Sequence, residues 1–143
     1  MKRTATAVWN GTGSDGTGRL TTRSKAFDSQ PYSFRTRFQS EDGTAGTNPE
    51  ELIAAAHAGC FTMALAFQLS NAGFTPDALR TEAILTMEKE EIGWTIKAIA
   101  LNLEATVPGI DRAQFEELAA TAKATCPVSR VLNADITLNA VLV

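Results

Sequence analysis

The stretch from Leu52 to Leu69 constrains the fold most, because its 18 consecutive residues carry no formal charge at neutral pH. That length would suffice to cross a membrane. The stretch is rich in alanine, however, and the polar side chains of His57, Thr62 and Gln68 interrupt it. It also lacks the basic and aromatic anchors that flank membrane spans. We therefore predict a helix that is apolar on every side and lies in a protein core or a subunit interface.

Both ends of this helix are marked in the sequence. Asn48 suits the capping position, Pro49 the first helical position, and Glu51 the third. At the other end, Gly73 follows Asn71 and can adopt the left-handed conformation that ends many helices. The predicted helix runs from residue 49 to about residue 71.

Strand-like segments lie on both sides of the helix. Before it, glycine-rich turn sequence separates strands, and in residues 31–38 alternation places Tyr32, Phe34 and Phe38 on one face, opposite Arg35 and Arg37. After it we expect a hairpin of residues 81–88 and 94–107, a helix capped by Asp111 through about residue 125, a short turn over 128–132, and a strand over 135–142. This order predicts a single α+β domain over residues 1–143.

Charge and termini exclude several functions. The chain has 143 residues and a net charge of −3, with no basic cluster, which argues against binding nucleic acid. The glycine-rich segment 10–18 lacks the Gly-Lys-Ser/Thr ending of a phosphate-binding loop. The first residues contain no apolar signal sequence, so we expect a cytoplasmic protein that is not inserted in a membrane.

The chain has two cysteines, Cys60 inside the apolar helix and Cys126 immediately before a proline. In a reducing compartment two cysteines are catalytic, redox-active or simply buried in the core more often than they form a structural disulfide. A nucleophilic thiol must first ionise, and apolar burial raises its pKa. Cys60 therefore needs a cation from elsewhere in the fold, and the candidates are Arg19, Arg23, Arg35 and Arg37.

A carboxylate that orients this arginine could be Glu50 or Glu51. Ten helical residues separate Glu50 from Cys60, which corresponds to about 15 Å along the axis. Either the helix breaks near Gly59, or the carboxylate beside Cys60 belongs to a second subunit. An apolar helix in so small a domain also favours a partner surface, so we predict a homodimer with the active site at its interface.

Cys126 would then act as a resolving thiol, which condenses with a sulfenic acid on Cys60 and prevents irreversible oxidation. His57 lies one turn before Cys60, so a cysteine–histidine pair is conceivable, although a hydrogen-bonded structural histidine is the commoner arrangement. A zinc site from His57, Cys60 and Cys126 would have only three strong ligands, and neither cysteine is part of a Cys-x-x-Cys pair. We predict no metal.

Two segments carry a resemblance to a known family: GTNPEELIAAAHAGCF at residues 46–61 and ATCPVS at residues 124–129. With both cysteine motifs at this separation, the chain closely resembles the OsmC/Ohr family of thiol-dependent hydroperoxide reductases. The AAHAGCF version of the first motif resembles the OsmC branch. The likeness extends to residues 31–38 and 107–111 and so covers nearly the whole chain.

The resemblance implies an intertwined α+β homodimer, with antiparallel sheets around a long central apolar helix. It implies a stress-response peroxidase that reduces organic hydroperoxides, and hydrogen peroxide more weakly, without metal or flavin. Cys60 matches the family's peroxidatic cysteine, Cys126 its resolving cysteine and Glu50 its catalytic glutamate. Arg37 matches the arginine of the OsmC branch, whereas the arginine of the Ohr branch lies near Arg19. The implied reductant is a dithiol, notably a protein-bound lipoyl group.

A second class of function stays open at this point. A non-catalytic stress protein could use an apolar pocket at the dimer interface to bind a lipid or another small molecule, with both cysteines as core residues. Apolar side chains such as Phe61, Met63, Ile53 and Phe38 suit either function, since each is equally plausible as core.

Overall fold

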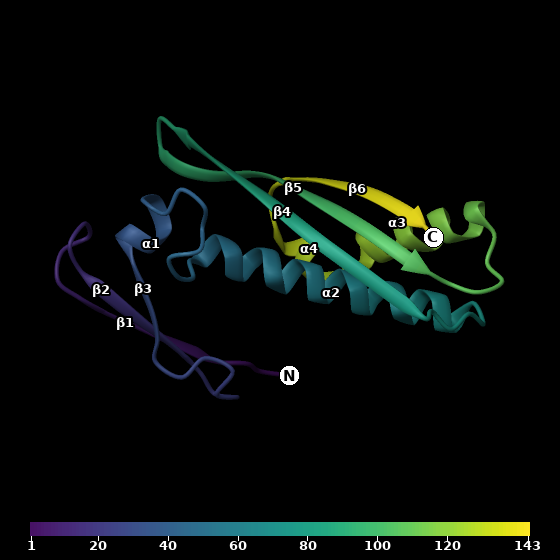
Figure 1. Ribbon diagram of the computed structural model, residues 1–143, viewed down its shortest axis with the longest axis horizontal. Helices are drawn as coiled ribbons and strands as arrows, with labels where there is room; N and C mark the ends of the chain where they lie inside the picture. The colour runs from purple at the N-terminus through teal and green to yellow at the C-terminus, as the bar shows by residue number, and fades with distance from the viewer. The chain divides into compact units, whose positions relative to one another are not determined.

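The computed structural model describes residues 1–143 and contains four helices and two three-stranded sheets (Figure 1). The chain forms two compact units, residues 1–52 and residues 53–143, and each has its own sheet. The predicted α+β class is confirmed. The single domain stays a prediction.

The first unit contains an antiparallel sheet of β1 (Ala5–Asn10), β2 (Thr17–Thr22) and β3 (Gln30–Ser33), in that order. Its register places Gly18 on the central strand between Trp9 and Tyr32. The Trp9 and Tyr32 rings lie 5.4 Å apart between centroids, and a side chain on Gly18 would collide with both. Glycine at this position therefore lets the two aromatic rings meet across the middle strand.

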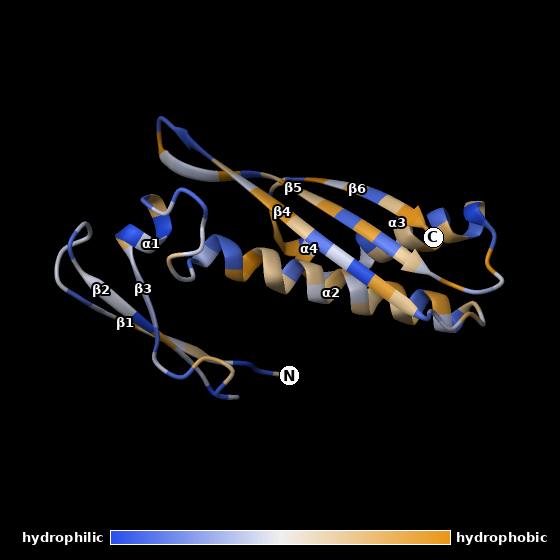
Figure 2. Ribbon diagram, viewed as in Figure 1, coloured by the Kyte–Doolittle hydropathy of each residue, from blue (hydrophilic) through white to orange (hydrophobic).

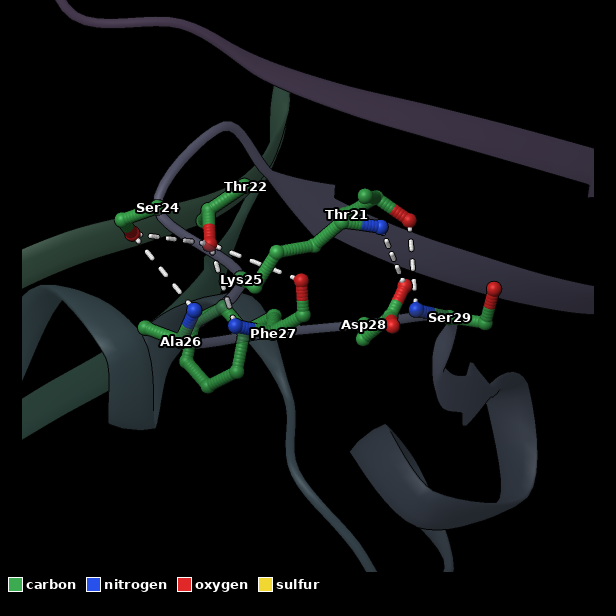
Figure 3. Close-up of polar contacts among 8 residues, drawn as sticks. All are labelled: Thr21, Thr22, Ser24, Lys25, Ala26, Phe27, Asp28 and Ser29. Carbon is green, nitrogen blue, oxygen red and sulfur yellow. Dashed lines mark hydrogen bonds and ion pairs between the residues drawn. The ribbon is translucent and has the colours of Figure 1, made fainter.

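The loop between β2 and β3 is braced by hydroxyl groups at the end of β2 (Figure 3). The Thr22 hydroxyl accepts the backbone N–H of Phe27 at 3.0 Å, and the Thr21 hydroxyl accepts that of Ser29 at 3.2 Å. Lys25 and Asp28 form an ion pair at 3.0 Å across the loop. Because these bonds fix both sides of the turn, β3 begins in register with β2.

The segment after β3 corrects the strand that we predicted through residue 38. β3 ends at Ser33, and α1 (Phe34–Phe38) follows. The Ser33 hydroxyl accepts the N–H of Thr36 at 3.2 Å, and the Thr36 hydroxyl accepts the N–H of Ser33 at 2.9 Å. This reciprocal cap begins a helix where side-chain alternation alone suggested an extended chain. The predicted strand face that carries Arg35 and Arg37 therefore does not exist.

Helix α2 (Pro49–Asn71) has the predicted bounds and is continuous through Gly59. The Asn48 side chain accepts the N–H of Glu51 at 2.8 Å, and Gly73 beyond the other end has a φ of +87°. Apolar residues recur along the whole helix in Figure 2. The helix is long and apolar enough to cross a membrane, a test that the core helix of a soluble protein also passes.

The second unit contains β4 (Ala78–Glu90) and β5 (Gly93–Thr106), which form an antiparallel hairpin, and β6 (Asp135–Leu142). Between β5 and β6 lie α3 (Arg112–Thr125), which Asp111 caps as predicted, and α4 (Pro127–Val131). β6 pairs with β5 in parallel, so this sheet is mixed rather than purely antiparallel as we expected. A parallel neighbour requires a crossover connection, which α3 and α4 supply.

The core of the second unit lies where α2, β5 and α3 meet. From α2 it receives one side chain per helical turn, and from β5 every second side chain, as the two periodicities require. Cys126, which is 0% exposed, belongs to the same core cluster as these side chains. The largest apolar side chains of this core are Phe61, Leu65, Leu69, Ile99, Leu101, Leu103 and Phe115.

Candidate active site

The two cysteines lie together in the second unit, although 66 positions separate them in the sequence. The Sγ atoms of Cys60 and Cys126 are 3.2 Å apart, and both are free thiols. A disulfide bond is about 2.05 Å long, so only a small approach of the two sulfur atoms is needed when an oxidant removes their hydrogens. Cys60 lies on α2 and is partly exposed, whereas Cys126 is buried.

Local sequence fixes the position of Cys126. Helix α3 ends at Thr125, and the N–H of Cys126 donates to the carbonyl of Ala122 at 2.9 Å. Pro127 then begins α4, as its fixed φ and missing N–H favour. Cys126 therefore sits at the junction of two short helices, where its side chain points back to α2 and Cys60.

The surroundings affect the two thiols in opposite directions. Burial raises the pKa of Cys60, and Cys126 beside it adds to the rise, whereas the N–H of Val128 opposes it. Burial also disfavours the Cys126 thiolate, but the N–H of Ser129, the Cys60 thiol and the Ser129 hydroxyl together lower the pKa of Cys126. No charged side chain of residues 53–143 is among the groups that lower the pKa of Cys60.

The His57 side chain forms its hydrogen bond with a serine rather than with a cysteine. It is 0% exposed, and its Nε2 atom lies 2.8 Å from the Ser129 hydroxyl oxygen, whereas its Nδ1 atom has no partner. Burial lowers the pKa of His57, so the imidazole is neutral at neutral pH. Ser129 was not among the residues predicted from the sequence, where its only signal is a hydroxyl three residues after Cys126.

In the first unit, Arg37 and Glu50 form a paired contact. The Arg37 Nε atom donates to one Glu50 carboxylate oxygen at 3.1 Å, and its Nη2 atom donates to the other at 2.6 Å. The guanidinium carbon also lies 4.8 Å from the centroid of the Phe38 ring. Two parallel bonds and a ring contact hold the guanidinium in one orientation, which suits the binding of a polar group.

A small pocket of about 80 Å³ lies beside this guanidinium. It is larger than the roughly 30 Å³ that one water molecule occupies in the liquid. Two of its aromatic walls, Phe34 and Phe38, contact each other with ring centroids 4.9 Å apart. A mostly aromatic wall with one cation suits a small organic molecule that has a polar end. The lining residues are Trp9, Gly13, Tyr32, Ser33, Phe34, Arg37 and Phe38.

The remaining candidates have other partners. Arg19 donates to the carbonyl of Ser29 at 3.1 Å, and Glu51 accepts the Thr47 hydroxyl at 2.6 Å. Phe61 is a fully buried core residue. No group of three or more histidine, cysteine, aspartate or glutamate side chains in residues 1–143 is arranged to hold a metal ion.

Comparisons with known proteins agree with the cysteine motifs. Residues 40–140 match the family described as OsmC-like protein. The chain is 50% identical over 133 residues to the Escherichia coli (strain K12) protein named Peroxiredoxin OsmC, which covers 93% of this chain and 91% of that protein. These matches confirm the resemblance to the OsmC/Ohr family.

Two solved structures have the same fold. An OsmC-like protein of unknown function from Vibrio cholerae aligns with a TM-score of 0.79 at 13% identity, over 99% of each chain. The organic hydroperoxide resistance protein OhrB of Bacillus subtilis aligns with a TM-score of 0.69 at 26% identity, over 96% of this chain and 98% of that one.

Proposed function

The chain belongs to the OsmC-like protein family, and we propose that it is a cytoplasmic, thiol-dependent peroxidase that reduces organic hydroperoxides to alcohols. Relatives named peroxiredoxin and organic hydroperoxide resistance protein support a peroxide-related function. The observation that carries the proposal is the pair of free thiols, with the sulfur atoms of Cys60 and Cys126 3.2 Å apart.

The proposed reaction has three steps. The Cys60 thiolate attacks the distal oxygen of the hydroperoxide, the O–O bond breaks, and the alkoxide takes a proton and leaves as an alcohol. Cys60 is then a sulfenic acid, which the Cys126 sulfur attacks to form a disulfide and release water. A dithiol, such as a protein-bound lipoyl group, reduces the disulfide by thiol–disulfide exchange.

We propose that each active site combines two subunits of a homodimer. Because α2 is continuous through Gly59, Glu50 of the same helix lies about 15 Å along the axis from Cys60. Burial raises the pKa of Cys60, so a cation must come from elsewhere, and the fixed guanidinium of Arg37 suits this role. Exposed Met63 and Phe67 on α2, at 61% and 64%, offer an apolar surface to a second copy.

The pocket beside Arg37 supports an organic rather than an inorganic peroxide. Its aromatic walls would hold an alkyl or aryl group, while the guanidinium donates hydrogen bonds to the peroxide oxygens. Hydrogen peroxide has no organic group to bury in the pocket. We therefore expect a higher kcat/KM for organic hydroperoxides.

Consumption of tert-butyl hydroperoxide with dihydrolipoamide as reductant tests the activity. Wild-type protein should turn over, Cys60→Ser should not, and one equivalent of peroxide should give a wild-type mass loss of two hydrogens. Equal activity of wild type and Cys60→Ser would refute the proposal. If Cys60→Ser also kept the affinity for an organic ligand, a non-catalytic binding protein would be the better explanation.

Mixing two inactive variants tests the shared site. When Arg37→Gln and Cys60→Ser subunits exchange at equal amounts, about half of the dimers are mixed, and each mixed dimer has one complete site. About a quarter of wild-type activity should return. If Arg37 acts on the cysteine of its own chain, no activity should return on mixing. Separately, a monomer in light scattering would exclude the dimer itself.

A further inference from the structure

A chain of polar groups leads from the core to the buried cysteine. His57 on α2 lies 2.8 Å from the Ser129 hydroxyl on α4. Cys126 occupies the capping position of α4, so Ser129 lies in the turn that directly follows the cysteine. The Ser129 hydroxyl is also one of the groups that lower the pKa of Cys126. Cys126 in turn lies 3.2 Å from Cys60. The three-step reaction assigns no role to His57 or Ser129.

The unpaired nitrogen of His57 indicates which tautomer is present. Buried polar atoms are nearly always paired, and a buried N–H without an acceptor is rarer than a buried acceptor without a donor. Because Nδ1 has no partner, we assign the hydrogen to Nε2, which then donates to the Ser129 oxygen. The Ser129 hydrogen remains free to be donated onward to the sulfur of Cys126.

On the basis of the proposed function, we propose that Ser129 is a catalytic residue and His57 a positioning residue for formation of the disulfide. Nε2–H of His57 donates to the Ser129 oxygen, and Ser129 O–H donates to the Cys126 thiolate. The hydroxyl thereby stabilises the attacking sulfur, and the histidine holds the hydroxyl in the orientation that does so.

The step is balanced without another reactant. Cys126 gives up its proton, and its sulfur lone pair forms the S–S bond to the sulfenic sulfur of Cys60. The S–O bond breaks with its electron pair on oxygen, and the leaving hydroxide takes a proton to become water. The Cys126 sulfur is oxidised, and the Cys60 sulfur is reduced by the same amount.

The groups that face His57 leave it uncharged. Its hydrogen-bond partner is Ser129 on α4, the helix that Cys126 caps. Burial alone lowers the pKa of His57, and no charged group contributes to the shift. We therefore treat the imidazole as a neutral donor in the proposed arrangement.

Titration of Cys126 tests directly, without any turnover, whether Ser129 stabilises the Cys126 thiolate. In a Cys60→Ser background Cys126 is the only cysteine left, so the ultraviolet absorbance of the thiolate reports its pKa alone. Ser129→Ala should raise that pKa by about one unit, a tenfold loss of thiolate at a fixed pH below it, because a hydrogen bond to the charged sulfur is removed. Ser129→Thr keeps the hydroxyl and should restore the wild-type titration.

Two further comparisons separate positioning from folding. His57→Gln keeps an N–H donor near the Nε2 position and should titrate like the parent, whereas His57→Leu should shift Cys126 in the same direction as Ser129→Ala. Thr125→Val is the matched control, since the Thr125 hydroxyl donates to the carbonyl of Thr121 rather than to sulfur. Thr125→Val should leave the titration unchanged.

The reaction itself supplies the second readout. After one equivalent of tert-butyl hydroperoxide, Ser129→Ala should still form a sulfenic acid that dimedone traps on Cys60, but its disulfide should form about tenfold more slowly. With excess hydroperoxide, which supplies the second oxidation, more of the Ser129→Ala protein should then reach the sulfinic acid, seen as a mass gain of two oxygens.

An unchanged Cys126 pKa together with a wild-type rate of disulfide formation in Ser129→Ala would overturn the proposal. Failure of the proposed function looks different, because wild-type protein would then form no sulfenic acid at all. In that case the titration in the Cys60→Ser background still decides whether Ser129 stabilises the Cys126 thiolate. If His57→Leu fails to fold, Ser129→Ala alone is sufficient for the test.

Discussion

Glu50→Gln isolates the contribution of the carboxylate that orients Arg37. The wild-type carboxylate accepts two bonds from the guanidinium, at 2.6 and 3.1 Å. Glutamine has nearly the same shape but replaces one acceptor oxygen with an NH₂ group, which would face a donor of the guanidinium. Arg37 should therefore lose one bond and the neighbouring charge, while the ring contact with Phe38 remains.

The size of the effect follows from the exposure of the pair. Hydrogen bonds to charged groups contribute about 1.5–3 kcal/mol when buried. The Arg37 side chain is 35% exposed and that of Glu50 15%, so solvent screens part of this energy, and about 1–2 kcal/mol is the appropriate value. If the Arg37 guanidinium that these two bonds orient acts in the transition state, a loss of about 1–2 kcal/mol predicts a roughly 5- to 30-fold lower kcat/KM.

The assay measures kcat/KM for tert-butyl hydroperoxide in wild type, Glu50→Gln and a control, Glu116→Gln. The control removes the carboxylate charge from a contact of similar length, the 2.7 Å bond between Arg112 and Glu116, at an exposed site. The control should keep wild-type kcat/KM. A wild-type kcat/KM in Glu50→Gln would refute the role of the carboxylate, and an equal loss in both variants would show a general effect of charge.

Three further predictions concern stability, measured by urea denaturation. Leu65→Ala removes a fully buried side chain from the core and should lower the free energy of unfolding by about 2–5 kcal/mol; a loss below about 1 kcal/mol would contradict the described core. Asp111→Ala removes the cap that accepts the N–H of Gln114 at 2.9 Å and should cost about 1 kcal/mol, whereas Asp111→Asn should keep most of it. Burial lowers the pKa of His57, so the unfolded chain binds a proton that the folded chain does not, and stability should fall as the pH drops below about 6.5. His57→Gln should lack that part of the pH dependence, and an equally steep fall in this variant would assign it to other groups.

Local signals predicted the elements that local chemistry determines. The caps at Asn48 and Asp111 and the glycine at position 73 each work through residues within one helical turn, and the structure has all three. The segment Phe34–Phe38 was predicted wrongly because its apolar residues alternate like those of a strand, while the deciding bonds are the reciprocal pair of Ser33 and Thr36. Alternation is a weaker signal than a cap in a segment of five residues.

In the candidate site, too, the sequence predicted residues that lie in local motifs but not contacts that form only in the fold. Family motifs singled out Cys60 and Cys126, but spacing alone gave no role to Ser129, because its hydroxyl matters only where α4 meets α2. The choice between Arg37 and Arg19 was likewise beyond the sequence, since both are exposed cations near strands. Their partners in the fold differ: Arg37 bonds a carboxylate, whereas Arg19 bonds the carbonyl of Ser29.

The parallel strand β6 shows a third kind of limit. Its bounds agree with the predicted strand over residues 135–142, because period-two alternation is visible in the sequence. Its direction depends on whether α3 and α4 return the chain to the starting end of β5 before β6 begins, and no local residue pattern records that. Topology is therefore predicted less well than the existence of an element.

In the proposed homodimer, the ionisation of Cys60 would be linked to assembly. Burial raises the pKa of this thiol within one chain, and the proposed cation belongs to Arg37 of a second copy. If pairing lowers the pKa of Cys60, ionisation of Cys60 must strengthen pairing by the same free energy, about 1.36 kcal/mol for each unit. A Cys60 held neutral, by a low pH or as Cys60→Ser, should then weaken the dimer. On this proposal, the partly exposed Cys60 thiol would stay protonated in an isolated subunit and would become reactive only where Arg37 of a second subunit is present.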